Sequence, residues 1–167
     1  MRYIILIMDL AFQLPWSSGY PINGLEKMLQ GNTMSPKPTP ITVLLVDDEA
    51  LVRKNASTIL KAEGFEVIEA VDGLDALYKY QISHDEISVI IMDIHMPKLN
   101  GISAARRIRE LDFSSRIIFI SGSTFQAPSE DLADAFLTKP LRGRDLVNAV
   151  RRVLRQKKVQ GPAATEG

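Results

Sequence analysis

Between residues 41 and 154 the chain alternates short continuous apolar runs with apolar residues that recur at helical spacing. A continuous apolar run predicts a strand buried on both faces, and a period of about 3.6 residues predicts a helix that covers it. The expected strands are residues 43–46, 65–70, 87–92, 117–120 and 135–137. Such alternation predicts an α/β fold, a doubly wound parallel sheet with helices on both faces and right-handed crossovers.

Glycine and aspartate mark the ends of several expected helices. Gly64 follows the first helical stretch at a position where glycine commonly ends a helix. Asp72 and Gly73 form a turn that begins the next helix, and a loop over residues 97–101 precedes the third. The apolar residues that recur at helical spacing, and so indicate the four helices, are Leu51, Val52, Ala56, Ile59 and Leu60, then Ala76, Leu77 and Tyr80, then Ile102, Ala105, Ile108 and Leu111, and finally Leu146, Ala149, Val150, Val153 and Leu154.

Residues 1–40 do not share this pattern. Residues 3–8 (YIILIM) form an apolar run that Asp9 interrupts, so the run is too short for a secretory signal or a membrane span. Residues 35–40 (SPKPTP) have the composition of an extended, proline-stiffened linker. We interpret residues 1–40 as an unstructured leader and linker, and both translation from Met34 and a genuine disordered extension stay open. Residues 41–155 are the expected domain, followed by a disordered tail over residues 156–167.

Composition narrows the class of protein further. The 167 residues include 20 basic and 20 acidic side chains, a formal net charge of zero, and no cysteine. A balanced charge argues against a polybasic nucleic-acid binder, whose affinity comes from neutralising phosphates. The lack of cysteine excludes disulfide scaffolds, zinc ribbons, iron–sulfur clusters and thiol nucleophiles. We therefore expect a cytoplasmic globular protein with one domain, and neither a nucleic acid nor a membrane as its direct partner.

Polar side chains stand at the ends of four expected strands, and in a doubly wound sheet the carboxyl ends of the strands meet at one edge, where ligands bind. Taken singly, an aspartate here would be interpreted as a helix N-cap, a serine as a turn residue and a lysine as a solvated loop residue. Their joint placement at one edge predicts a site instead. The strand-end residues are Asp47, Asp48 and Glu49, then Asp93, then Ser121 and Gly122, and finally Thr138, Lys139 and Pro140.

Three aspartates at this edge would require a cation. Asp47, Asp48 and Asp93 would repel one another by about 4 kcal/mol per pair at a separation of about 4 Å and an effective dielectric constant of about 20. Because the candidate ligands are all oxygen atoms, Mg²⁺ is favoured over zinc. Lys139 offers a point charge suited to a phosphoryl oxygen, and Ser121 can donate a hydrogen bond to another.

Five sequence motifs, in this order and spacing, resemble the receiver domain of two-component response regulators. They are VLLVDDE, EAVDGLDAL, IIMDIHMPKLNG, FISG and FLTKPL, and the resemblance covers about residues 41–154. It implies a flavodoxin-like fold with five strands in the order 2-1-3-4-5. The chain has no Gly-rich phosphate loop, G-x-S-x-G elbow or H-E-x-x-H motif, so the common nucleotide-binding, hydrolase and metalloprotease interpretations fail.

The resemblance also assigns roles to the strand-end residues. It implies that Asp93 accepts a phosphoryl group from a phosphohistidine on a histidine kinase or phosphotransfer protein. Asp48, Asp93 and the backbone carbonyl of His95 would ligate Mg²⁺, and Asp47 would act through water. The remaining implied roles are contacts of Ser121 and Lys139 with the phosphoryl group, a switch formed by Ser121 and Phe136, and a cis peptide bond between Lys139 and Pro140.

The chain departs from the family pattern at several positions. Only 18 positions separate Ser121 from Lys139, and Leu132 stands where a glycine often precedes the fifth strand. We therefore expect the helix between the fourth and fifth strands to be short or irregular. His95 and Ser123 occupy positions that the family uses to tune dephosphorylation, and the sequence does not give the sign of their effect.

The resulting expectation is a stand-alone receiver that works in a phosphorelay, has no enzymatic activity beyond its own phosphorylation and dephosphorylation, and signals to a downstream protein. Whether the phosphorylated form dimerises stays open. The basic residues near the end, Arg151, Arg152, Arg155, Lys157 and Lys158, are interpreted as a solvated face that complements the helix dipole.

Two alternatives come from other functional classes. One is a magnesium-dependent phosphatase of the haloacid dehalogenase type, which requires an acid two residues after the nucleophile; here His95 stands at that distance from Asp93. The other is a pseudo-receiver that binds partners without being phosphorylated.

Overall fold

A computed structural model describes residues 39–122 and 132–156 of the chain. The expected leader with Met34, the tail from residue 157, Ser123, Lys157, Lys158 and most of the segment expected to hold a short helix lie outside these residues. In chain order the elements are β1 (Thr42–Val46), α3 (Ala50–Ala62), β2 (Glu66–Ala70), α4 (Gly73–Ser83), β3 (Ile87–Asp93), α5 (Gly101–Leu111), β4 (Ile117–Ser121), β5 (Ala135–Thr138) and α6 (Gly143–Arg155).

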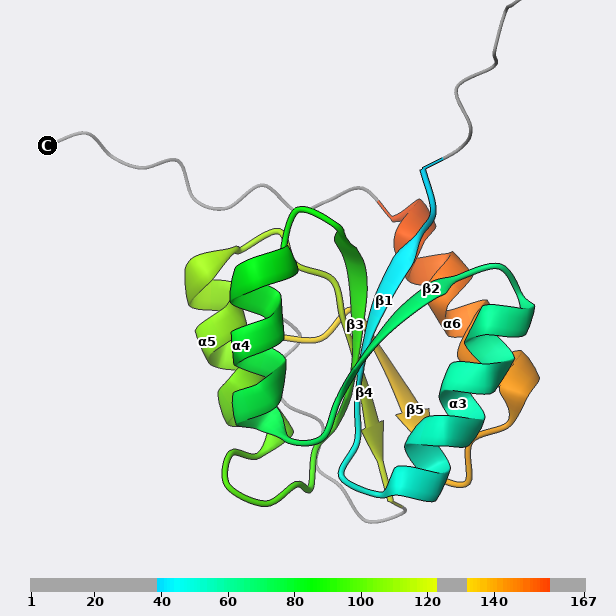
Figure 1. Ribbon diagram of the computed structural model, residues 1–167, viewed down its shortest axis with the longest axis horizontal. Helices are drawn as coiled ribbons and strands as arrows, with labels where there is room; N and C mark the ends of the chain where they lie inside the picture. The colour runs from blue at the N-terminus through cyan, green and yellow to red at the C-terminus, as the bar shows by residue number, and fades with distance from the viewer. Residues whose placement is uncertain (1–38, 123–131, 157–167) are drawn as a thin grey trace, which may run out of the picture. The chain divides into compact units, whose positions relative to one another are not determined.

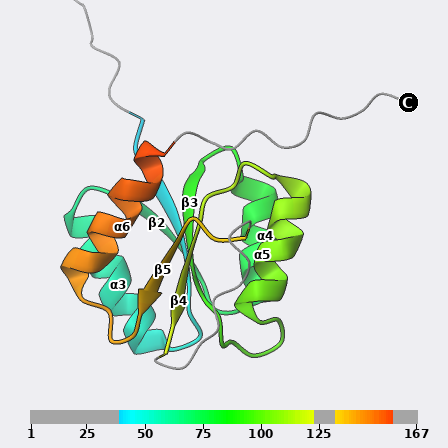
Figure 2. The same ribbon diagram turned by 180° about the vertical axis from the view of Figure 1, so that it is seen from behind.

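The strands form one parallel sheet in the order β2-β1-β3-β4-β5. Helices α4 and α5 cover one face of the sheet, and α3 and α6 cover the other (Figures 1 and 2). The expected α/β class, parallel topology and strand order are therefore confirmed.

Two apolar cores lie on opposite faces of the sheet, because alternate residues of each strand point to opposite faces. Val43 and Leu45 of β1 pack with α3 and α6, whereas Leu44 and Val46 pack with α4 and α5. All five residues of β1 and all five of β4 are buried. This double burial explains why these strands appear in the sequence as continuous apolar runs and not as alternating ones.

Local signals in the sequence end and begin the helices. Gly64 has a φ of 87°, a left-handed conformation that suits glycine after a helix. Asp72 is the N-cap of α4, since its side chain accepts hydrogen bonds from the backbone N–H groups of Leu74 and Asp75. Asn100 caps α5 in the same way through the N–H of Ser103.

Two of the apolar residues that recur at helical spacing are exposed. Leu51, in the first turn of α3, is 79% exposed, and Leu111, the last residue of α5, is also largely exposed. Both lie in terminal turns, where a residue can match the helical period and still extend beyond the sheet that the rest of the helix covers. Helical spacing alone therefore does not place a side chain in the core.

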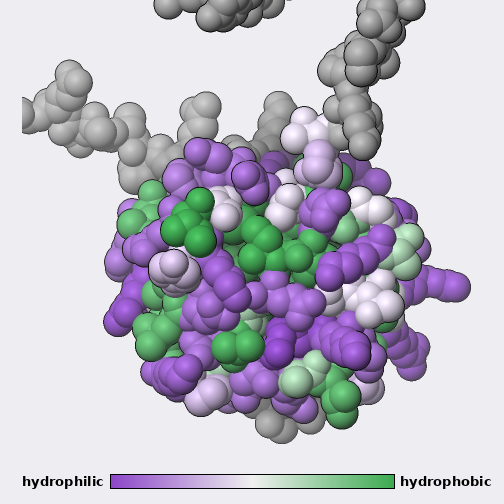
Figure 3. All heavy atoms as spheres, viewed as in Figure 1, coloured by the Kyte–Doolittle hydropathy of each residue, from purple (hydrophilic) through white to green (hydrophobic). Residues whose placement is uncertain are grey.

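The face of the molecule seen in Figure 1 is mostly polar. Figure 3 shows that hydrophilic side chains dominate the face seen in Figure 1, with hydrophobic ones exposed in smaller areas. Within the described residues, no helix is both long enough and apolar enough to span a membrane.

Candidate functional site

The predicted strand-end residues are held in place by the sheet itself. The third and fourth strands each extend one residue further than expected, so Asp93 ends β3 and Ser121 ends β4. Asp93 is paired in register with Ile120, and Ser121 with Thr138. Because these two residues belong to the hydrogen-bonded ladder, their side chains leave the sheet at fixed positions on its carboxyl edge. Asp47 follows β1 at the same edge, and Lys139 follows β5.

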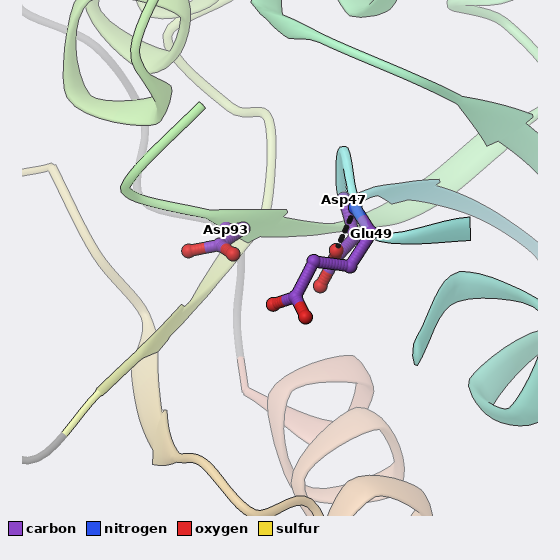
Figure 4. Close-up of side chains that lie close together, drawn as sticks. All are labelled: Asp47, Glu49 and Asp93. Carbon is purple, nitrogen blue, oxygen red and sulfur yellow. Dashed lines mark hydrogen bonds between the residues drawn. The ribbon is translucent and has the colours of Figure 1, made fainter. Parts of the chain in front are cut away.

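Lys139 brings three carboxylates together. Its Nζ lies 2.5 Å from Asp93 Oδ2, 2.9 Å from Glu49 Oε1 and 3.1 Å from Asp47 Oδ2. Figure 4 shows the carboxylates of Asp47 and Glu49, just after β1, and of Asp93, at the end of β3, gathered around one space. Asp47 and Asp93 are buried, whereas Glu49 is exposed. The site is therefore a mostly buried anionic pocket that one ammonium group balances in part.

The charges in this pocket shift one another's pKa values. Burial raises the pKa of the Asp47 carboxyl, although the backbone N–H of Glu49 and the ammonium of Lys139 oppose the shift. Burial would lower the pKa of Lys139, but its interactions with the carboxylates of Asp93, Glu49 and Asp47 raise that pKa above its ordinary value. Lys139 therefore stays charged throughout the physiological pH range.

Backbone groups fix the orientation of the acidic side chains. The N–H of His95 donates to Asp93 Oδ1 at 3.1 Å, and the N–H of Glu49 donates to Asp47 Oδ1 at 2.8 Å. In addition, the guanidinium group of Arg53, in α3, donates a hydrogen bond to the backbone carbonyl of Asp47 at 2.6 Å. Each of the two buried aspartates therefore has one oxygen bound to the local backbone and the other directed to Lys139.

The donor set fits a divalent cation. Asp47, Glu49 and Asp93 each offer an oxygen atom, and these atoms all lie within 4.8 Å of one another. Asp47 Oδ2 is buried and accepts no hydrogen bond from the described residues; its contact there is the ion pair with Lys139. Carboxylate oxygens are the ligands that Mg²⁺ prefers in proteins.

The structure brings together a different acidic set from the expected one. Asp48, an expected ligand, is exposed and does not belong to the group of three, whereas Glu49, which the sequence did not single out as a ligand, does. The only sequence signal that pointed to Glu49 as a member of the site is its position directly after Asp47 and Asp48.

The remaining predicted residues lie on β4 and β5 or directly after β5. Ser121 is buried, and its Oγ donates to the carbonyl of Gly122 at 3.1 Å. Phe136 is 40% exposed and stacks on the buried ring of Phe119, with 5.9 Å between ring centroids. The Lys139–Pro140 peptide bond is cis.

A cavity of about 520 Å³ opens beside the pocket. Glu49 and Lys139 lie at its polar side, and apolar side chains of α3, α6 and the β5–α6 connection form much of the rest, including Val52, Ile59, Leu141 and Leu146. A large group that approaches Lys139 from this side would therefore meet an apolar surface.

Comparison with known proteins gives consistent matches. Residues 43–151 match the family described as response regulator receiver domain. Chemotaxis protein CheY of Treponema pallidum is 34% identical over 129 residues, which cover 72% of this chain and 87% of that protein. Aerobic respiration control protein ArcA of Escherichia coli K12 is 35% identical over 117 residues, which cover 67% of this chain but only 48% of ArcA, so the chain spans about half of that relative.

Solved structures agree with the sequence matches. The crystal structure of the CheX–CheY–BeF3–Mg²⁺ complex from Borrelia burgdorferi contains a chain with a TM-score of 0.66 and 34% sequence identity. The match covers 70% of this chain and 91% of that one.

Proposed function

The chain belongs to the response regulator receiver family, and on this premise we propose that Asp93 accepts a phosphoryl group from a phosphohistidine on a histidine kinase or phosphotransfer protein. Receiver domains are phosphoacceptors and not classical enzymes. The observation that carries the proposal is the position of Asp93, a buried carboxylate at a strand end with Lys139 Nζ 2.5 Å from its Oδ2. The ammonium group of Lys139 can neutralise negative charge on a phosphoryl group that is attached to this oxygen of Asp93.

The transfer of the phosphoryl group requires little covalent chemistry from the protein. The ionised carboxylate of Asp93 attacks phosphorus without a general base, and an O–P bond forms as the P–N bond to the imidazole breaks. The electron pair of that bond leaves with the imidazole. The ammonium group of Lys139 stabilises the negative charge that develops on one phosphoryl oxygen. The hydroxyl of Ser121 leaves the Gly122 carbonyl and donates a hydrogen bond to another phosphoryl oxygen.

A divalent cation completes the proposed site. We assign Asp48, Asp93 and the backbone carbonyl of His95 as its ligands, with Asp47 acting through water, and the structure adds Glu49 as a neighbouring carboxylate. When bound, Mg²⁺ supplies positive charge to the phosphoryl oxygens. The Borrelia burgdorferi complex contains BeF3 and Mg²⁺, which supports the choice of Mg²⁺ as the cation.

The proposed output is a change of surface. A turn of Ser121 toward the phosphoryl group would leave space behind it. Phe136 lies on β5 two residues before Thr138, the register partner of Ser121, is 40% exposed, and would reorient toward that space. A downstream protein would then bind the altered surface. We also propose that the protein removes the phosphoryl group from Asp93 itself. Its proposed location is the cytoplasm.

Labelling with a small phosphodonor tests the proposal. Incubation with Mg²⁺ and acetyl phosphate should add one phosphoryl group to the intact mass, and Asp93→Ala should abolish the gain. Asp85→Ala is a matched control, because the Asp85 side chain is almost fully exposed and Asp85 precedes the amino end of β3, whereas Asp93 is the last residue of that strand. Label retained in Asp93→Ala would refute the assignment of the acceptor.

Two further results would favour the alternatives. Many cycles of hydrolysis of a small phosphomonoester per site would indicate a phosphatase of the haloacid dehalogenase type. An unchanged biological output in Asp93→Asn would indicate a pseudo-receiver.

A further inference from the structure

A buried carboxylate and an exposed ammonium join two parts of the domain. Asp72, the N-cap of α4, is 2% exposed, and the Nζ of Lys98, a residue with 63% of its side chain exposed, lies 2.5 Å from Asp72 Oδ2. The other oxygen of Asp72 accepts the N–H groups of Leu74 and Asp75. Loss of Lys98 would therefore leave one oxygen of a buried carboxylate without its cation.

Lys98 lies in the β3–α5 loop, residues 94–100, in a strained conformation. Its φ of 63° is the only left-handed value at a non-glycine position among the described residues. A left-handed backbone conformation is energetically unfavourable for lysine. It persists only where contacts with the surrounding structure stabilise it. The N–H of Leu99 donates to the carbonyl of Pro97 at 2.7 Å and closes a γ-turn around Lys98, while the ion pair with Asp72 holds the side chain of the same residue.

The same loop rests directly on the start of α4. The N–H of Gly73 donates to the carbonyl of Leu99 at 3.2 Å, and a Cβ at residue 73 would lie 2.3 Å from that oxygen. The loop and the helix therefore touch backbone to backbone, with the Lys98–Asp72 pair beside the contact.

The other end of this loop belongs to the candidate site. Ile94 and Met96 are buried in the core on the α4 and α5 face, whereas His95 between them is exposed. The N–H of Gly101 closes the loop by donating to the carbonyl of Ile94 at 3.0 Å. The path of the backbone at His95 is thus set by contacts on both sides of it, and Lys98 supplies the charged one.

We infer that Lys98 is a positioning residue for the metal site: by binding Asp72 it holds the β3–α5 loop on α4 and so fixes the backbone carbonyl of His95 toward the cation. This inference rests on the proposed function, which assigns that carbonyl as a ligand. Groups that orient metal ligands affect affinity strongly although they do not touch the metal.

Mg²⁺ titration calorimetry and amide hydrogen exchange on the full chain test the inference. Lys98→Met removes the charge and keeps the length of the side chain, and Lys98→Arg restores a cation. Lys61→Met is the matched control, since Lys61 is also an exposed lysine paired with a carboxylate, that of Glu69. We expect Lys98→Met to weaken Mg²⁺ binding about tenfold, with Lys98→Arg and Lys61→Met close to wild type.

Hydrogen exchange without metal gives an independent readout. The amide of Gly73, whose acceptor is the Leu99 carbonyl, should exchange about tenfold faster in Lys98→Met and at the wild-type rate in the control, because one lost charge-assisted hydrogen bond corresponds to roughly this factor. Wild-type Mg²⁺ affinity in Lys98→Met would overturn the inference and leave the proposed function standing. A wild-type protein that binds no Mg²⁺ would instead refute the assigned metal site.

Discussion

Gly101 packs against the backbone carbonyl of Asp93 so closely that a Cβ at residue 101 would lie 2.1 Å from that oxygen. The first residue of α5 is therefore in backbone contact with the residue proposed to be phosphorylated. A side chain at residue 101 would have to displace either the helix or the end of β3, and both carry buried apolar residues.

Gly101→Ala should consequently destabilise the domain by about 3 kcal/mol, as expected for overpacking of a closely packed interior. Gly143→Ala is the control, because Gly143 also begins a helix but its Cβ would meet only the flexible side chain of Ile59, at 3.2 Å. Urea denaturation of both variants measures the difference. Equal stability of the two variants would show that the contact with Asp93 can relax without cost.

Lys139→Ala should destabilise the metal-free protein, because Asp47 and Asp93 would remain buried without their counter-charge. We expect a loss of about 2 kcal/mol, less than for a fully buried pair because the lysine is partly exposed. Mg²⁺ should restore more stability to this variant than to wild type. Thermal unfolding with and without Mg²⁺ measures both effects, with Lys61→Ala as the control for loss of an exposed lysine.

The prediction for Lys139 fails if the metal-free variant unfolds at the wild-type temperature. In that case the three carboxylates would be solvated or protonated well enough to need no cation.

Much of the fold and part of the site follow from local features of the sequence. The continuous apolar runs predict the strands, because burial on both faces leaves no position for a polar residue before the strand end. For the same reason Asp93, Ser121 and Lys139 stand out as site residues. The family resemblance supplies the strand order, which apolar periodicity does not determine.

Other features depend on side-chain direction, which the sequence does not encode locally. Asp47, Asp48 and Glu49 are consecutive acidic residues at the end of one strand, and only the backbone turn after β1 decides that Asp47 is buried and Asp48 exposed. The Lys98–Asp72 pair joins residues 26 positions apart. Leu51 has the correct helical spacing, but its turn of α3 extends beyond the core.

The stability of the domain should depend on pH through Asp72. Its pKa lies below the ordinary value of 3.8, chiefly because of the hydrogen bond from Lys98 and then that from the N–H of Asp75. A carboxyl whose pKa falls on folding stabilises the fold above its unfolded pKa, and this contribution disappears as the pH falls through its folded pKa. Wild type should therefore be more stable than Asp72→Asn at pH 7, and the difference should shrink as the pH falls below 3.8 and through the lower pKa of the folded protein.

Chemical denaturation at several pH values measures this difference, and Asp85→Asn is the control because Asp85 is almost fully exposed. A stability gap between wild type and Asp72→Asn that stays constant down to pH values near 3 would contradict the role assigned to the charge of Asp72. The control should show a much smaller gap, because the contact of Asp85 among the described residues is an exposed ion pair with His84.

Phe119 and Phe136 stack on each other but should differ greatly in their contribution to stability. Phe119 is fully buried in the core on the α4 and α5 face, so Phe119→Ala should cost about 4 kcal/mol, through lost burial and the cavity that remains. Phe136 is half exposed, and Phe136→Ala should cost only about 1 kcal/mol, most of it the stacking contact. Denaturation midpoints of the two variants compare the rings directly. A small cost at Phe136 means that its ring can leave the observed orientation at little expense, as the proposed switch requires, whereas a cost equal to that of Phe119 would show that the ring is held where it lies.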